Sequence, residues 1–253
     1  MSADNYLLAI LNRETVDTGS FSPARGAQAT LQPLLSQWAS TYLVSVSPSG
    51  SFAKGTANRS GTDIDLFLSI SNQCTNTLSE IYERLFTKMK ENGYAPIRQN
   101  VSIKVRVNSF DVDLVPGKRQ DSYSEDHSLW RRKAETWTKT NVLKHINYVR
   151  SGNRINEIRI IKLWRDQKRL DFPSFYLEMV VIEALSGSYS GTLADNVWKV
   201  FHYLRDKFTN ARFVDPANTN NIISDDLSVA ERAAIKAAAV QTLAAQNWSQ
   251  IVV

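Results

Sequence analysis

The chain has 253 residues, 43% of them hydrophobic, which is enough to form a sizeable core in one large domain or two lobes. Its net charge is +5 and its sequence pI is about 9.3, so its surface attracts polyanions. The single cysteine, Cys74, excludes an internal disulfide, and with three histidines beside it a Cys/His zinc site is not expected. No apolar run is long enough to cross a bilayer, and the first residues lack the basic segment of a signal peptide. We therefore expect a cytoplasmic protein without a membrane partner.

The front half of the chain predicts a mixture of helices and strands. Helices are expected over residues 4–18, 23–40 and 77–92; the second begins at a Ser-Pro start signal and the third ends at Asn-Gly. The expected strands are residues 42–47, 63–70, 94–99, 101–108 and 110–115. The polar segment 117–127 is expected to be a loop.

The back half of the chain predicts helices. They are expected over residues 142–150, 154–167, 174–186, 194–208 and 228–246. The last one opens with a capping box, in which Ser228 is followed three residues later by Glu231. Residues 209–226 are the longest irregular stretch, and long ordered loops often serve function.

Two aspartates alternate with aliphatic residues along the expected strand 63–70. One side of the strand carries Ile64, Leu66, Leu68 and Ile70, and the other carries Asp63, Asp65, Phe67 and Ser69. This alternation predicts a half-buried strand that holds two carboxylates on one face. Like charges two residues apart repel each other, so a fold that keeps them normally supplies a cation. Mg²⁺ suits carboxylate oxygens and the phosphates of a nucleotide.

A glycine and a serine precede this strand in the expected turn Pro48-Ser49-Gly50-Ser51. Gly50 allows the backbone to approach a ligand closely, amides at such a turn can hold a phosphate, and Ser51 adds a hydroxyl donor. An ordinary turn, followed by a strand whose aspartates face water, would explain Gly50 and Ser51 alone. The nearby pair of aspartates favours the functional interpretation.

A further carboxylate is expected on the strand 110–115. Phe110, Val112 and Leu114 lie on one face of this strand, and Asp111 and Asp113 lie on the other. Periodicity does not choose between the two aspartates. Either one could simply keep an edge strand soluble.

Gly50-Ser51, a spacer of about a dozen residues and then Asp63-Ile64-Asp65 resemble the DNA polymerase beta-type nucleotidyltransferase superfamily. The resemblance implies a third carboxylate on a neighbouring strand, just before an aliphatic pair and a proline. This pattern selects Asp113, with Asp111 as the alternative. It also implies that Asp63, Asp65 and Asp113 are catalytic and bind metal.

The chemistry implied by the resemblance uses two Mg²⁺ ions, or Mn²⁺ in their place, roughly 3.5–4 Å apart. The ions would bridge the carboxylates, the triphosphate and an attacking hydroxyl. Such phosphoryl transfer needs positioning and charge neutralisation more than covalent participation by the protein. Asp113 could also help to remove the proton of the hydroxyl.

The helical half adds a second group of candidate residues. Lys162 and Trp164, then Pro-Ser-Phe-Tyr-Leu-Glu at residues 173–178, are similar to the helical lobe of 2′-5′ oligoadenylate synthetases and of bacterial CD-NTases (cyclic GMP-AMP synthase/DncV-like enzymes). Further matching segments are Phe110–Pro116, Trp137–Asn141 and Asp215–Asn221.

This resemblance implies that Lys162 and Ser174 contact the triphosphate and that Phe175 stacks on the base. The relatives usually have tyrosine in place of Phe175, which keeps the ring but lacks the hydroxyl for a hydrogen bond. Asp215 is expected in lobe packing or in a loop near the nucleotides. Without the resemblance, an amphipathic helix with a basic face and aromatic core residues would explain these side chains.

The fold class we expect is α/β (α+β) in two lobes, with the nucleotides in the cleft between them. A small mixed sheet would form the catalytic lobe, residues 1–139, and a helical bundle the nucleotide-binding lobe, residues 140–253. The expected function is template-independent nucleotidyl transfer from NTPs such as ATP. The product would be a cyclic or short linear oligonucleotide second messenger in bacterial anti-phage signalling.

Two alternative functions are left open by the sequence. One is the addition of nucleotides to an RNA 3′ end, as in CCA-adding or poly(A) polymerases. The other is a nucleotide- or RNA-binding module that has lost catalysis, although the presence of all three carboxylates argues against such a loss. Basic clusters such as Arg131-Arg132-Lys133 are compatible with RNA as an activator or substrate, and they are equally typical of a solvated surface. The oligomeric state is not predicted.

Overall fold

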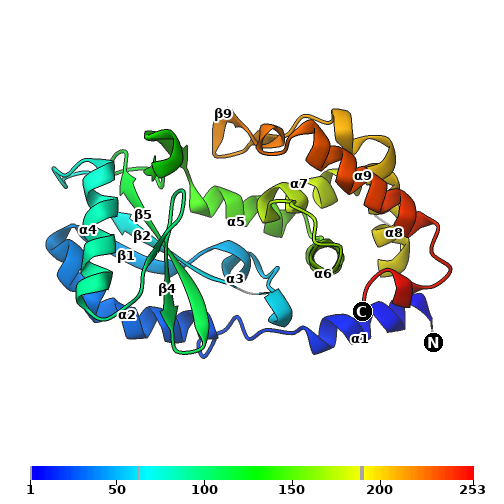
Figure 1. Cartoon of the computed structure of the whole chain (residues 1–253), viewed down its shortest axis with the longest axis horizontal. Helices are drawn as coiled ribbons and strands as arrows, with labels where there is room; N and C mark the ends of the chain where they lie inside the picture. The colour runs from blue at the N-terminus through cyan, green and yellow to red at the C-terminus, as the bar shows by residue number, and fades with distance from the viewer. Residues whose placement is uncertain (1, 62, 189–190) are drawn as a thin grey trace. The chain divides into compact units, whose positions relative to one another are not determined.

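The computed structural model describes residues 2–61, 63–188 and 191–253. The chain forms two compact units (Figure 1). The helical unit consists of Met1–Val16, Thr56–Gly61 and Asn147–Val253, and the sheet unit consists of Asp17–Gly55 and Thr62–Ile146. The fold class is therefore the expected one, a mixed α/β structure with a sheet-containing part and a helical part. The proposed cleft between them stays a prediction.

The division of the chain differs from the predicted boundary at residues 139 and 140. Two early segments, Met1–Val16 and Thr56–Gly61, belong to the helical unit. Helix α1 (Ala3–Arg13) packs there against two other helices of that unit, and its buried residues Leu7, Ile10 and Leu11 form one apolar stripe. A helix with one apolar stripe is stabilised by the core that buries the stripe. For α1 this is the core of the helical unit, whose other residues lie far away in the sequence.

The sheet unit is built on a mixed sheet whose strand order is β1-β2-β5-β4-β3, extended from β5 through β6 to β7. Its strands are β1 (Leu43–Pro48), β2 (Ile64–Ile70), β3 (Ile97–Arg98), β4 (Ile103–Val107), β5 (Phe110–Arg119), β6 (His127–Arg131) and β7 (Thr136–Thr140). Strands β2 and β5 run parallel, and the other described pairs are antiparallel. The segment expected as a loop over 117–127 is shorter, because β5 continues to Arg119 and β6 starts at His127.

Helices α2 (Pro23–Ala39) and α4 (Leu78–Glu91) pack against this sheet and against each other (Figure 1). The third helix of the unit, α3 (Gly50–Lys54), is short and contacts β2. Ser22 caps α2, and Thr77 with Glu80 forms a capping box at the start of α4. These caps satisfy the first backbone N–H groups of each helix, which have no partner within the helix.

Strand β2 is buried on both of its faces beyond Asp65, whereas the sequence predicted a half-buried strand. Phe67 and Ser69 are 5% and 2% exposed. His127 covers them: its ring meets the Phe67 ring edge-on at 4.9 Å, and its Nε2 lies 2.8 Å from Ser69 Oγ. Burial lowers the pKa of His127, so the ring is neutral at neutral pH and tolerates the apolar contact. The periodicity of β2 did not reveal that His127 covers its second face, because His127 lies about sixty positions after Phe67 in the sequence.

The helical unit surrounds one large apolar core. Its helices are α1, the end of α5 (Val142–Ser151), α6 (Ile155–Gln167), α7 (Ser174–Ala184), α8 (Leu193–Asp206) and α9 (Val229–Leu243), and a hairpin of β8 (Val214–Asp215) and β9 (Asn218–Ile222) completes it. Trp164 on α6 is fully buried, and its Nε1 donates to Thr242 Oγ1 at 2.8 Å. The predicted capping box of Ser228 and Glu231 is confirmed at the start of α9. None of the helices in the described part of the chain has the length and apolar character to cross a bilayer.

Gly117 generates a prediction about stability. A Cβ atom there would lie 2.5 Å from Phe67 Cζ and 3.1 Å from Leu129 Cδ2. We expect Gly117→Ala to lower the free energy of unfolding by about 1–3 kcal/mol, because the Phe67 ring must leave its position against His127. Urea denaturation measures the change.

Gly26→Ala is the matched control, since Gly26 lies inside α2 and an added Cβ would meet no atom within 4 Å. That variant should gain up to about 1 kcal/mol from helix propensity. In a Phe67→Leu background the penalty of Gly117→Ala should shrink. Equal effects of the two alanine substitutions would contradict the packing described for β2.

Candidate active site

The parallel pairing of β2 and β5 brings two of the predicted aspartates together. Asp65 is the register partner of Asp113, and Ile64 is the partner of Val112. Register partners on neighbouring strands direct their side chains to the same face of the sheet. Asp63, directly before β2, precedes Asp65 by two positions and lies at the same end of the strand.

Strand β4 adds two cations to this end of the sheet. Lys104 pairs with Asp113 and Arg106 with Asp111 in the antiparallel register of β4 and β5. The ammonium of Lys104 lies 2.9 Å from Asp63 Oδ2 and 3.9 Å from Asp111 Oδ2. Lys104 is not among the predicted site residues, although a basic residue that alternates on a strand beside an acidic strand is a signal for it.

Asp113 has the most perturbed carboxyl group of this cluster. Burial, the largest cause, raises its pKa to about 6; Lys104 acts in the opposite direction, and Asp65 and Asp63 raise the pKa further. Its Oδ1 atom is buried without a hydrogen-bond partner among the described residues. An unsatisfied carboxylate oxygen beside two further carboxylates fits a divalent cation, which would supply the missing interaction.

The predicted metal ligands are nevertheless not gathered into a finished metal site. Within the described ranges, no group of three or more His, Cys, Asp or Glu side chains is arranged to hold an ion. The ammonium of Lys104 forms a salt bridge with Asp63, whose side chain is 54% exposed. Metal binding by Asp63, Asp65 and Asp113 stays a prediction.

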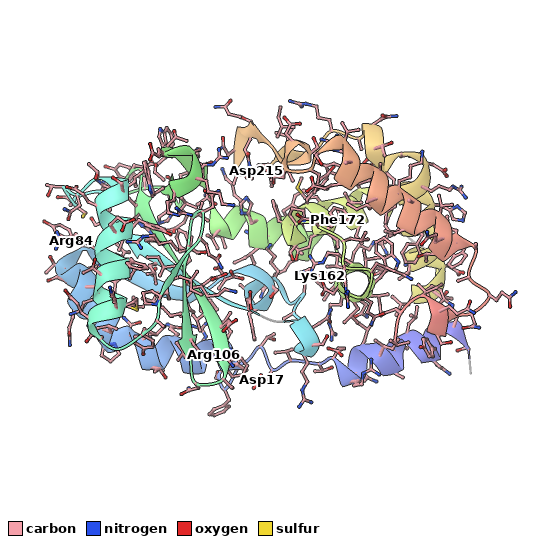
Figure 2. The ribbon with its side chains drawn as sticks, viewed as in Figure 1. Asp17, Arg84, Arg106, Lys162, Phe172 and Asp215 are labelled. Carbon is pink, nitrogen blue, oxygen red and sulfur yellow. The ribbon has the colours of Figure 1, made fainter. Side chains whose placement is uncertain are left out.

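Asp111 and Asp113 differ in their hydrogen-bond partners. Asp111 Oδ1 accepts a hydrogen bond from Arg106 Nη1 at 3.0 Å, and Arg106 also donates to the Ser109 carbonyl (Figure 2 labels Arg106). Asp113 has the unpartnered oxygen and is aligned with Asp65. The geometry thus favours Asp113 over Asp111.

Gly50 and Ser51 begin helix α3, where the sequence predicted only a turn. Gly50 has a φ of +54°, and a Cβ atom on it would lie 1.7 Å from Asp65 Oδ2. Only glycine leaves room for the Asp65 carboxylate there. The backbone N–H of Ser49 donates to the Asp65 carbonyl at 2.8 Å, which anchors α3 to β2.

Lys162 in the helical unit is buried, with 5% of its surface exposed (Figure 2). Its ammonium lies 2.6 Å from Glu178 Oε1 and 2.9 Å from Thr56 Oγ1. Thr56 also donates to Glu178 Oε1 at 2.7 Å, so the buried charges are paired and bonded. The sequence did not identify Thr56 or Glu178 as partners of Lys162. A triphosphate contact of Lys162 stays a prediction.

Ser174, the first residue of α7, is exposed. Its Oγ accepts a hydrogen bond from Arg165 Nη1 at 2.9 Å, and the same guanidinium donates to the Phe172 carbonyl. The Ser174 hydroxyl proton therefore points elsewhere, and Arg165 adds a positive charge beside the start of a helix, where anions are favoured. The sequence did not predict a role for Arg165 beside Ser174.

Phe175 and Tyr176 follow on α7 and have different environments. Tyr176 is fully buried among Phe172, Phe208 and Phe213, so it belongs to the core. Phe175 is half-buried and meets the Tyr148 ring edge-on at 6.3 Å. Stacking of Phe175 on a base is compatible with this exposure and stays a prediction.

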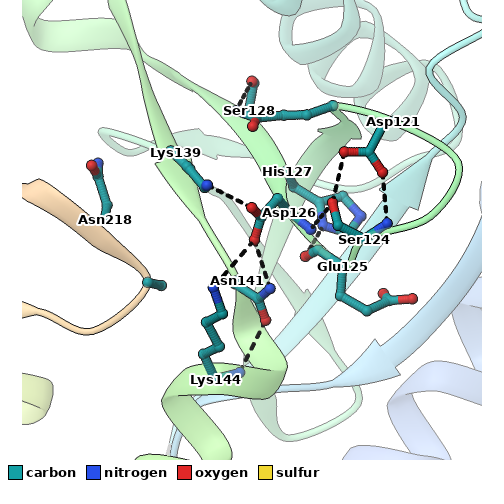
Figure 3. Close-up of polar contacts among 12 residues, drawn as sticks. Asp121, Ser124, Glu125, Asp126, His127, Ser128, Lys139, Asn141, Lys144 and Asn218 are labelled. Atoms are coloured by element: carbon teal, nitrogen blue, oxygen red, sulfur yellow. Dashed lines mark hydrogen bonds and ion pairs between the residues drawn. The ribbon is translucent and has the colours of Figure 1, made fainter.

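Two of the segments that carried the resemblance have structural roles. Asp215 is 5% exposed, and its two carboxylate oxygens accept from the Ala217 N–H and from Asn221 Nδ2, which holds the turn between β8 and β9. Asn141 caps α5 by accepting from the Lys144 N–H (Figure 3). Asn141 also donates to Asp126, whose Oδ2 lies 2.5 Å from Lys139 Nζ.

The chain is similar in sequence to one curated protein described below. No family model matches it. Cyclic AMP-AMP-AMP synthase of Escherichia coli (strain MS 115-1) is 24% identical over 176 residues, which are 64% of this chain and 55% of the relative. The chain thus spans about half the length of this curated relative.

Solved structures share the fold along nearly the whole chain. CdnC of E. coli MS115-1 with ATP has a TM-score of 0.76 at 20% identity, over 95% of this chain and 90% of that chain. The CD-NTase CdnG of Bradyrhizobium diazoefficiens with GTP has a TM-score of 0.79 at 12% identity, over 95% and 90%. Cid1 poly(U) polymerase with Mg and 3′-dATP has a TM-score of 0.68 at 13% identity, over 97% and 95%. The predicted resemblance to the nucleotidyltransferase superfamily, with CD-NTases among the relatives, is confirmed.

The pKa of Asp113 predicts a stability change with pH. Its folded-state pKa of about 6 exceeds the ordinary 3.8, so the native protein loses stability as pH rises between these values. Asp113→Asn removes that charge and should raise the free energy of unfolding above pH 6 by on the order of 1–2 kcal/mol, allowing for solvent screening. The gain should vanish below about pH 4. Urea denaturation without added metal, at several pH values, measures it.

Asp111→Asn is the control for this experiment, because Arg106 and Lys104 compensate its carboxylate. It should give no gain at neutral pH. If Asp113→Asn instead lowered the free energy of unfolding above pH 6, the native structure would stabilise the charged Asp113 carboxylate, which would contradict the prediction.

The buried pair of Lys162 and Glu178 generates another prediction. Lys162→Met leaves the Glu178 carboxylate buried without its cation and should lower the free energy of unfolding by about 3–5 kcal/mol. The double variant Lys162→Met/Glu178→Leu should recover most of the loss. Lys168→Met, an exposed change at the end of α6, is the control. A loss below about 1 kcal/mol in Lys162→Met would show that the pair is open to water in solution.

Proposed function

We propose that the chain is a template-independent nucleotidyltransferase that joins NTPs, ATP among them, into a cyclic or short linear oligonucleotide and releases pyrophosphate. The observation that carries the proposal is the register of Asp65 and Asp113 on parallel strands, with one oxygen of Asp113 buried and without a hydrogen-bond partner in the described part of the chain. The activity of the E. coli relative, cyclic AMP-AMP-AMP synthesis, supports this reaction class.

Asp63, Asp65 and Asp113 are the residues that would hold divalent metal, Mg²⁺ or Mn²⁺. When bound, the metal supplies charge neutralisation for the triphosphate and a more acidic acceptor hydroxyl. For Asp63 to take part, its carboxylate has to leave Lys104, and the 54% exposure of its side chain leaves room for such a rotation. Lys104 then remains beside Asp111 as a positive charge at the edge of the site.

Asp113 is suited to accept a proton from the attacking hydroxyl. Without metal its pKa is raised to about 6 by burial, so its carboxylate holds a proton more strongly than an ordinary aspartate does. Its orientation is restricted because the neighbouring residues Val112 and Leu114 are fully buried in the sheet. Gly50 limits the position of Asp65 from the other side, since its backbone fills the space beside that carboxylate.

The nucleotide-binding residues are proposed to be Gly50 and Ser51 in the sheet unit and Ser174, Phe175 and Lys162 in the helical unit. Ser174 can donate its hydroxyl proton to a phosphate oxygen because Arg165 occupies its acceptor side. Lys162 would act from its buried site with Glu178 and Thr56, so any contact with a phosphate needs a rearrangement of that cluster.

The biological setting that we propose is a bacterial anti-phage system in the cytoplasm, with the product as second messenger. The cyclic AMP-AMP-AMP synthase activity of the relative supports the signalling role. One structure of CdnC is a complex with HORMA-deltaN, which supports a protein partner for this chain as well.

Addition of nucleotides to RNA is the second candidate function, favoured by the likeness to Cid1 poly(U) polymerase. Incubation with Mg²⁺ and labelled NTPs, with and without RNA, separates the two functions. Phosphatase-resistant products formed without RNA would support cyclic messenger synthesis. Products that form only by extension of the added RNA would support the second candidate. NTP binding without pyrophosphate release under any condition would support an inactive binding module.

The catalytic carboxylates give the sharpest activity prediction. Asp65→Asn and Asp113→Asn should each lower pyrophosphate release at least about a hundredfold, which corresponds to ~3 kcal/mol of the barrier. Asp111→Asn should stay within about tenfold of the unchanged protein, because Asp111 is engaged by Arg106. Asp206→Asn, at an exposed ion pair on α8, is the control. Equal losses in Asp111→Asn and Asp113→Asn would contradict the assignment.

A further inference from the structure

The sheet unit contains a pocket of about 190 Å³ at the end of β2 opposite to the acidic residues. It lies among the end of α2, the end of β2 and the start of α4. Asp65 and Ile70 are five positions apart on β2, so the pocket is about 16 Å from the carboxylates along the strand. The proposed nucleotide chemistry uses none of its residues.

The pocket is lined by buried apolar residues and by aromatic residues. Ile70, Cys74 and Ile81 are 1%, 5% and 5% exposed and form one apolar cluster. Trp38 and Tyr42 also line the pocket. Aromatic and aliphatic lining residues favour a planar ring, which can stack on an aromatic side chain or meet it edge-on.

The volume limits the ligand to one ring system. Pockets for drug-sized ligands have about 300–1,000 Å³, whereas an engineered apolar cavity of about 150 Å³ binds benzene. A pocket of about 190 Å³ therefore accommodates a single ring with a small substituent.

The positive charge of Arg84 at the pocket favours an anionic substituent on the ligand ring. Arg84 on α4 is the one charged residue among the described residues that line it. Its Nη1 makes a long contact of 3.4 Å with Asn76 Oδ1, which engages little of a fork of five N–H donors. The nearby carboxylate of Glu83 is bound by Arg98 at 2.6 Å. An anionic group such as a carboxylate is thus the favoured partner of Arg84.

The backbone beside the pocket is held in an uncommon conformation. Ser40, another lining residue, has a φ of +49°, a region that favours glycine. Strained non-glycine residues cluster at ligand sites, where the surrounding structure fixes them. In this fold the turn at Ser40 separates α2 from β1, between Trp38 and Tyr42.

We propose that this pocket binds a small aromatic carboxylate, with the ring between Trp38 and Tyr42 and the carboxylate on Arg84. The ligand would be an effector and not a substrate, because it lies at the other end of β2 from Asp65. The proposal is independent of the nucleotidyltransferase reaction.

Benzoate is the probe, and Cys74 provides a specific reporter because it is the chain's single cysteine and lines the pocket. Benzoate should slow the alkylation of Cys74 by N-ethylmaleimide, with a Kd on the order of 1 mM, as expected for a fragment of this size. Benzamide, which has the same shape without the charge, should bind at least about tenfold more weakly, and acetate should not protect. Whole-protein mass spectrometry measures the rate.

Arg84→Gln should weaken benzoate at least about tenfold and leave benzamide unchanged. Lys88→Gln, one turn further along α4 and outside the pocket, is the matched control and should bind benzoate normally. If Cys74 does not react, ¹³C-methyl NMR shifts of Ile70 and Ile81 replace it as the readout. Absence of protection and of shifts at about 20 mM benzoate, or equal binding of benzoate and benzamide, would overturn the proposal.

Discussion

The parallel pairing of β2 with β5 is the contact on which the candidate active site depends. Its register places Asp65 beside Asp113, and a slip of one residue would turn one of the two carboxylates to the opposite face of the sheet. Buried neighbours on both strands hold this register, because Ile64, Val112 and Leu114 are fully inaccessible to solvent. The core thus forces together two charges that would separate in water.

The protein handles its two polar clusters in opposite ways. In the helical unit, Lys162, Glu178 and Thr56 bond to one another, so buried charge is paired with buried charge. In the sheet unit, one oxygen of Asp113 is buried without a partner among the residues that the structure describes, and Lys104 forms its salt bridge with Asp63. A satisfied cluster stabilises the fold, whereas an unsatisfied one lowers stability and is retained where a ligand completes it. This contrast supports the proposed site in the sheet unit.

Most helices and strands followed from local patterns, because their apolar spacing and caps are properties of neighbouring residues. The helix at Pro23–Ala39 and the capping boxes at Thr77 and Ser228 are examples. The pattern missed α3, β6 and β7. Helix α3 has five residues, too few for a periodic signal, and β6 and β7 contain charged and polar residues that gain order by pairing with each other and with β5.

By itself, the sequence determined that two strands each carry aspartates opposite an aliphatic face, that a glycine-serine pair precedes them, and that the second half is helical. Those features depend on period and residue type. Only the tertiary structure decided that Asp113 and not Asp111 is aligned with Asp65, that Lys104 is the cation beside Asp63, and that Lys162 is paired with Glu178. Each of these depends on strand register or helix packing between residues distant in sequence, and local pattern carries no information on which distant side chains will share a buried, low-dielectric space.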